Sequence, residues 1–193
     1  MAGDGSALPT SAAPYVVGVR YPAKDELSLH PRDRIAMLVR EDGETQTALA
    51  CEEVLLGEHD PPLCLWIGGR HAVTRIEGPW PKTWALRAFL YCWDDRVAAS
   101  VLDALEDEGW RVREMAAKVV VRRGLPGAHL LVPLLADPLP RVRVAGLRGL
   151  GAVGEAEHAD AVLEALGDGD GDVARAASGA LARLEGRLDR RFG

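Results

Sequence analysis

Cysteines are few in this chain, and none has the spacing that cysteine chemistry needs. Three occur among 193 residues without any C-x-x-C pair, namely Cys51, Cys64 and Cys92. An odd number of unpaired cysteines suits a reducing compartment, so we expect no disulfide framework and a cytoplasmic protein. Zinc needs three or four ligands at organised spacing, and the histidines do not supply them. We therefore expect no metal and no cofactor.

A long apolar run is also missing. No stretch approaches the roughly 18 apolar residues that a membrane-spanning helix requires. The opening residues MAGDGSALPTSAAPYVV have neither a basic region nor an apolar core of signal-peptide length. We expect no membrane association and no secretory signal. Residues 1–14, rich in Gly, Ser, Ala and Pro, are expected to form a disordered tail.

Motifs that carry catalysis are absent as well. No G-x-S-x-G, H-E-x-x-H or phosphate-binding loop occurs, and Gly68-Gly69 alone is not a nucleotide signature. The densest group of reactive side-chain types is His71 with Cys64 and Trp66, which we interpret as a packed loop in preference to a small-ligand corner. We therefore expect the protein not to be an enzyme.

One acidic stretch, DGDGD at 168–172, alternates oxygen ligands as calcium loops do. The rest of the EF-hand pattern fails, because Val173 stands where glycine is needed and Gly179 where the bidentate glutamate is needed. We interpret the stretch as a capped turn, with Asp172 as a cap or near-cap of the helix that follows.

Excess positive charge is missing overall, since the formal net charge is -6, but the charges are unevenly placed. Residues 1–80 carry 7 basic and 12 acidic side chains, and residues 81–193 carry 16 and 17. Inside the nearly neutral second part lies a basic island, residues 109–150, with two acidic residues. Its basic residues are Arg111, Arg113, Lys118, Arg122, Arg123, Arg141, Arg143 and Arg148.

The sequence does contain an internal repeat. Segments of eleven residues that begin at Asp107, Asp137 and Asp168 superpose at spacings of 30 and 31 residues, and a weaker copy begins at Glu77. In each copy apolar residues recur at helical spacing, as at Val112, Met115, Ala116, Val119 and Val120. A glycine-containing break and a second apolar run follow, at 129–136 and 160–166. Each period is therefore predicted to be a helix, a turn and a helix.

The repeat resembles the HEAT-repeat family, especially the short bacterial subtype related to phycobilisome-lyase HEAT-like repeats. The pattern D-x5-R-x-x-A carries the resemblance, in Asp107, Arg113 and Ala116 and again in Asp137 and Arg143, with Gly146 at the alanine position. The resemblance covers about residues 79–187 and implies that these aspartates and arginines form a ladder between repeats. Thr83 and Ala174 replace the arginine in the first and last copies, so we expect the ladder to be interrupted at both ends.

The section before the repeats is less regular. Residues 31–39 and 44–56 predict two helices separated by Asp42-Gly43. The run LCLWIGGRHAVTRI from Leu63 to Ile76 allows a β-hairpin or a broken helical hairpin, and we favour the helical interpretation. The expected organisation is a tail (1–14), an irregular section of divergent helical repeats (15–78) and HEAT-like repeats (79–193). The fold class is an all-α superhelix of antiparallel helix pairs.

Stacked helix pairs expose an extended surface for partners, so we expect a protein–protein interaction module or scaffold, and a monomer. The candidate partner-binding residues are Trp110, Arg111, Arg122, Arg123, Arg141 and Arg148. The alternative is a nucleic-acid-binding protein, related to DNA repair, in which the basic island meets phosphates and Trp110 stacks on a base. Arg113 and Arg143 are expected to be structural, paired with Asp107 and Asp137.

Overall fold

The computed structural model describes residues 19–75 and 77–193, which form helices with no strand among them. The expected tail at 1–14 lies outside the described residues. The α-helices of the described part are α1 (Pro31–Asp42), α2 (Glu44–Leu56), α3 (Pro61–Gly68), α4 (Trp80–Ala88), α5 (Ala98–Asp103), α6 (Trp110–Arg123), α7 (Pro140–Val153), α8 (Ala159–Glu164) and α9 (Gly171–Leu188). The predicted fold class, an all-α solenoid, is confirmed.

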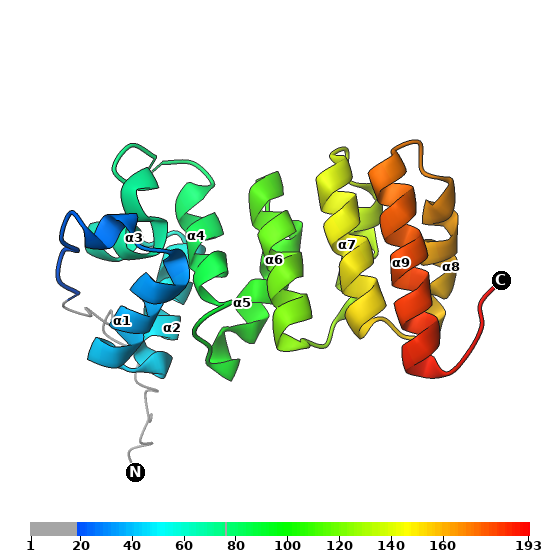
Figure 1. Cartoon of the computed structure of the whole chain (residues 1–193), viewed down its shortest axis with the longest axis horizontal. Coiled ribbons are helices and arrows are strands. Elements are labelled where there is room, and N and C mark those ends of the chain that lie inside the picture. The colour runs from blue at the N-terminus through cyan, green and yellow to red at the C-terminus, as the bar shows by residue number, and fades with distance from the viewer. Residues whose placement is uncertain (1–18, 76) are drawn as a thin grey trace, which may run out of the picture.

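The repeats form a two-layered array. In Figure 1, α4, α6, α7 and α9 stand side by side in chain order, and we call them the long-helix layer. They begin at residues 80, 110, 140 and 171, which reproduces the period found in the sequence. Pro140 lies in the first turn of α7, where its missing N–H costs nothing.

The second helical segment of each repeat is short and partly of 3-10 type. We call these segments the short-helix layer, which consists of η3 (Asp95–Val97), α5, η4 (Ala104–Glu106), η5 (Ala128–Leu131), η6 (Pro133–Ala136), η7 (Ala156–His158), α8 and η8 (Ala165–Gly167). The predicted run 129–136 is two 3-10 turns. Pro133 cannot lie inside an α-helix, so the chain breaks before it and restarts with Pro133 in the first turn of η6.

Close contacts in the array depend on glycines of α7. A Cβ atom added to Gly146 would lie 2.9 Å from the Leu134 Cβ and 3.2 Å from the Leu131 carbonyl oxygen. A Cβ atom added to Gly151 would lie 2.9 Å from the Ala180 Cα of α9. The glycine found at the alanine position of the second repeat therefore allows α7 to approach the short-helix layer more closely than alanine would.

The section before the repeats is helical and shares their core. Gly43, with a φ of 89°, separates α1 from α2. The helical interpretation of the run from Leu63 is correct for its described residues, where α3 is followed by η2 (Gly69–His71). Buried apolar side chains form one continuous cluster from Ile35 in α1 to Ala180 in α9.

A buried cation closes the end of α3. Arg34 is 3% exposed, and its Nε donates to the Trp66 carbonyl oxygen at 2.6 Å. Arg87 of α4 donates to the next carbonyl, that of Ile67, at 2.7 Å. Loss of hydration and the neighbouring Arg87 charge lower the pKa of Arg34 to about 10. These two arginines tie α1 and α4 to the carbonyl end of α3.

Candidate functional site

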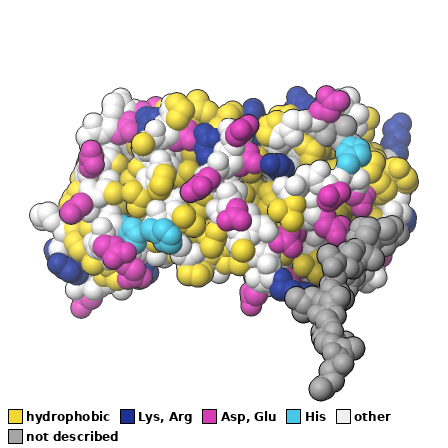
Figure 2. All heavy atoms as spheres, turned by 180° about the vertical axis from the view of Figure 1, so that it is seen from behind, with side chains coloured by type: hydrophobic (Ala, Val, Ile, Leu, Met, Phe, Trp, Pro, Cys, Tyr) yellow, Lys and Arg dark blue, Asp and Glu magenta, His cyan; other side chains and the backbone are white. Residues whose placement is uncertain are grey.

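Charge is segregated between the two layers. Helices α6, α7 and α9 together carry eleven basic and three acidic residues. The short-helix layer carries one basic and six acidic residues. Figure 2, the view from behind, shows hydrophobic side chains and more acidic than basic ones on that side. The array therefore presents a basic face on α6, α7 and α9, and a face of opposite sign on the other side.

Part of this basic charge is used inside the repeat array. Arg113 donates from Nε and Nη2 to Asp137 Oδ2 at 2.8 and 2.5 Å, and from Nη1 to the Asp107 carbonyl oxygen at 2.7 Å. Arg143 repeats this pattern one period later, binding the Asp168 carboxylate at 2.8 and 2.9 Å and the Asp137 carbonyl oxygen at 2.9 Å. Each arginine therefore joins the aspartate backbone of its own repeat to the aspartate side chain of the next.

The two ends of this ladder differ. At the first copy Thr83 occupies the arginine position, but Lys82 reaches the Asp107 carboxylate at 2.8 Å. The expected interruption is therefore wrong at this end, because a long side chain one position earlier supplies the cation. The last copy has Ala174 at that position, and no ladder pair follows Asp168 in the described residues. The Arg143 hydrogen bonds and the Asp170 N–H lower the pKa of Asp168.

Two tryptophans and three arginines form a stack across the starts of α4, α6 and α7. The guanidinium carbon of Arg111 lies 4.0 Å from the Trp110 ring centre and 4.7 Å from the Trp80 ring centre. Arg141 lies 4.7 Å from Trp110, and Arg75 lies 5.1 Å from Trp80. These cation–π contacts link neighbouring repeats, and two guanidinium groups already cover the Trp110 ring.

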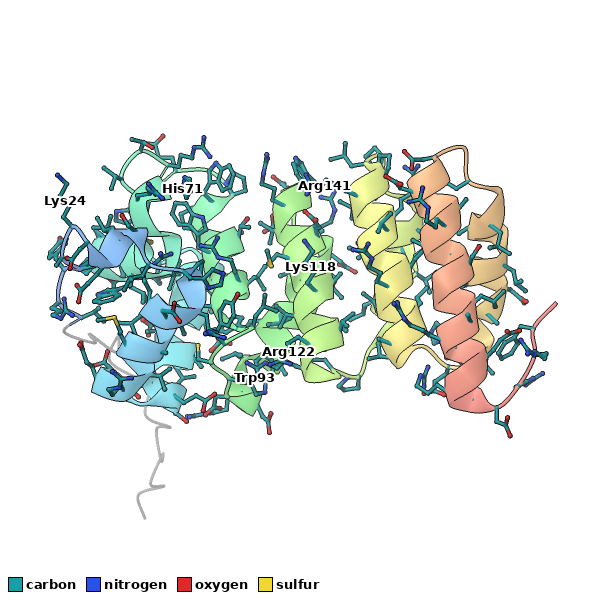
Figure 3. The ribbon with its side chains drawn as sticks, viewed as in Figure 1. Lys24, His71, Trp93, Lys118, Arg122 and Arg141 are labelled. Carbon is teal, nitrogen blue, oxygen red and sulfur yellow. The ribbon has the colours of Figure 1, made fainter. Side chains whose placement is uncertain are left out.

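The structure does not bring all six candidate partner-binding residues together. Trp110, Arg111 and Arg141 belong to the stack, whereas Figure 3 places Arg122 toward the other end of α6. Arg148 lies exposed on α7. Arg123 turns inward, where it donates to the Phe89 and Cys92 carbonyl oxygens at 2.8 and 3.1 Å. Arg123 therefore closes a helix end instead of facing a partner.

A groove of about 760 Å³ runs between α7 and α9 on the basic face. Arg141 and Arg148 line it from α7, and Arg175 and Arg183 line it from α9. The two arginines of α9 lie outside the basic island, residues 109–150, so the clustering of basic residues in the sequence does not indicate them. Their spacing of eight residues, about two turns along one side of a helix, is the signal that would have found them.

The acidic stretch at 168–172 and the group around His71 do not form metal-binding sites among the described residues. Asp170 caps α9 by accepting from the N–H groups of Asp172 and Val173, so the cap is Asp170, two residues before the predicted Asp172. Cys64 is buried while His71 is exposed, which separates the reactive types around that loop. Within residues 19–75 and 77–193, no group of three His, Cys, Asp or Glu side chains could hold a metal ion. No helix in that part is long and apolar enough to cross a membrane.

Comparison with known proteins agrees with this architecture. The family model for HEAT repeats matches residues 128–190, the segment from η5 to α9. No curated protein matches the chain. HEAT repeats generally mediate protein–protein interaction or scaffolding. Residues 128–190 are therefore similar to HEAT repeats, and the repeated helix pairs and the arginine–aspartate ladder have the arrangement that this similarity implies.

Proposed function

We propose that this protein is a non-enzymatic interaction module that binds an acidic segment of a protein partner on the exposed face of α6, α7 and α9. The observation that carries the proposal is the charge segregation, because these helices expose seven basic residues and one acidic residue. Complementary charge increases association rates and selects partners even where each exposed ion pair contributes little affinity.

Several cations of this face are free to meet a partner. Arg122, Arg148 and Arg183 are exposed, and none of them has an ion pair or hydrogen bond within the described residues. Each of these arginines can therefore bind a partner without breaking a contact inside the protein. The ladder arginines Arg113 and Arg143, by contrast, are committed to neighbouring repeats and hold the face rigid.

Nucleic acid is the competing ligand, since phosphates also seek basic surfaces. Two features favour a protein. The Trp110 ring is covered by Arg111 and Arg141, so a base would have to displace a guanidinium group before stacking on it. Acidic residues also interrupt the face, and Glu114 pairs with Lys118 at 2.8 Å and with Arg141 at 3.3 Å.

The test reverses the three free cations together, in the variant Arg122→Glu/Arg148→Glu/Arg183→Glu. The matched control is Lys24→Glu/Arg40→Glu/Arg70→Glu, which makes the same change of net charge with exposed, unpaired residues before the repeats. Partners are captured on the wild-type chain, and chemical cross-linking with mass spectrometry maps the contact. We expect cross-links to α6, α7 and α9, and capture lost only in the first variant.

A result in which the first variant captures the same proteins as the wild type would contradict the proposal. A gel shift with duplex DNA at low and high salt decides the alternative. Binding that weakens steeply as salt rises, and that the first variant abolishes, would favour nucleic acid.

A further inference from the structure

The groove between α7 and α9 has an apolar floor between charged rims. Pro140 and Val144 contribute the floor from α7 and Leu139 from the residue before it, and Ala176 and Gly179 contribute it from α9. No atom lies within 4 Å of a Cβ added to Gly179, so the floor is open at this point. A floor of small side chains allows another backbone to approach closely, while the rims contribute charge.

The two ends of the groove differ in charge. At the end where α7 and α9 begin, the arginines are already neutralised, because Arg141 pairs with Glu114 at 3.3 Å and Arg175 pairs with Asp172 at 2.6 Å. Asp170 adds a further carboxylate there. About two turns along each helix, Arg148 and Arg183 line the same groove without a carboxylate partner.

This difference in charge between the two ends favours an acidic ligand and determines the direction in which it lies along the groove. Carboxylates of a partner are favoured beside Arg148 and Arg183, and repelled by Asp170 and Asp172 at the other end. An amphipathic helix places apolar side chains on a narrow floor at i, i+3 and i+4 spacing. Carboxylates are most stable at the N-terminal end of a helix, where the macrodipole is positive. Figure 1 shows α7 and α9 running in the same direction, so Arg148 and Arg183 lie toward the same end of the groove. Both arginines therefore favour the same orientation of a bound helix.

We infer that the α7–α9 groove binds an amphipathic helix of a protein partner, with the acidic N-terminal end of that helix beside Arg148 and Arg183 and its axis antiparallel to α9. This inference rests on the proposed function and identifies the segment of the partner that docks. The neutralised end accepts an uncharged or basic C-terminal end, because Asp170 and Asp172 face it.

A display library of helix-forming peptides of about 18 residues, the length of α9, tests the inference on the full chain. We expect the enriched peptides to have an apolar stripe and acidic residues in their N-terminal turns. The enriched peptides are then synthesised with a fluorescent label, and their affinities are measured by anisotropy. A peptide with the same composition but with its acidic residues moved to the C-terminal end should bind about tenfold more weakly, because it loses two exposed ion pairs and also places its carboxylates beside Asp170.

The variant Arg148→Glu/Arg183→Glu should weaken binding of the enriched peptides at least about tenfold, and Arg148→Gln/Arg183→Gln about threefold. The control Arg40→Glu/Arg70→Glu should leave binding unchanged. Failure to enrich any peptide, enrichment of C-terminal acidic residues, or binding unaffected by the groove variants would overturn the inference. Peptide binding that is lost in Arg122→Glu but retained by the groove variants would overturn the assignment of the binding site to the groove, and it would leave the proposed function standing. Peptides indifferent to all three cations would overturn both.

Discussion

Removal of the Asp137 carboxylate tests whether the ladder holds the repeats together. The Asp137 side chain is 4% exposed, and it accepts two hydrogen bonds from Arg113 and one from the Leu139 N–H, at 2.9 Å. Asp137→Ala therefore leaves a guanidinium group that is 17% exposed without its carboxylate, and an N–H group without its acceptor. Breaking a buried ion pair costs about 3–5 kcal/mol, and the partial exposure of Arg113 places the expected loss near the lower limit.

Urea denaturation followed by circular dichroism measures this loss as a change in the free energy of unfolding. A loss of about 3 kcal/mol should also lower the melting temperature by about 6–12 °C in a chain of this size. The control is Asp172→Ala, which removes a 74% exposed carboxylate paired with Arg175 and should change stability by less than about 0.5 kcal/mol.

The double variant Arg113→Met/Asp137→Leu should recover much of the lost stability, because it leaves no uncompensated charge in the interior. Equal stabilities of Asp137→Ala and Asp172→Ala would refute the reasoning that the ladder binds adjacent repeats. A double variant that is as unstable as Asp137→Ala would show that packing, and not the unpaired charge, causes the loss.

Two further perturbations test the packing and the electrostatics of the array. Gly151→Ala should cost about 1–3 kcal/mol in urea denaturation, because its Cβ would meet the backbone of α9, whereas Gly186→Ala, with open space around it, should stabilise α9 by about 0.5–1 kcal/mol. Equal effects of the two substitutions would contradict the close contact. Hydrogen bonds from Arg20 and from the Ala23 N–H lower the pKa of Glu26 from 4.5 to about 2. Since the folded state favours the charged form, this contribution to stability is present above pH 4.5 and lost as the pH falls toward 2. The protection factor of the Ala23 amide, its exchange rate relative to the unstructured chain, should fall over that interval in the wild type and show no such step in Glu26→Gln.

The repeat array was predictable because the spacing of the aspartates and the spacing of the apolar residues indicate the same helices. The spacings of 30 and 31 residues between Asp107, Asp137 and Asp168 set the starts of α6, α7 and α9, and the apolar stripe sets their buried sides. The short-helix layer was less predictable, because an apolar run interrupted by Pro133 has the composition of a helix but not its backbone. Pro133 divides the run into two 3-10 turns, η5 and η6.

The site was less predictable than the fold, because a linear run of basic residues does not say where each side chain points. Arg122 and Arg123 are neighbours in sequence, yet one is exposed and the other binds carbonyl groups inside the array. The α9 rim, Arg175 and Arg183, lies outside the basic island and joins it only through the stacking of α9 on α7.

The ladder also determines how an array of this kind can change in length. Each internal arginine donates to a backbone carbonyl of its own repeat and to the aspartate carboxylate of the next repeat. A repeat therefore supplies an aspartate that accepts from the preceding repeat and an arginine that donates to the following one. A duplicated unit from Asp107 to Ala136 contains both the aspartate and the arginine of the ladder. It can therefore be inserted between existing repeats without leaving a charge unpaired. An insertion of half that length would separate the aspartate from its helix. Whole periods are therefore the step by which such a chain gains or loses surface for partners.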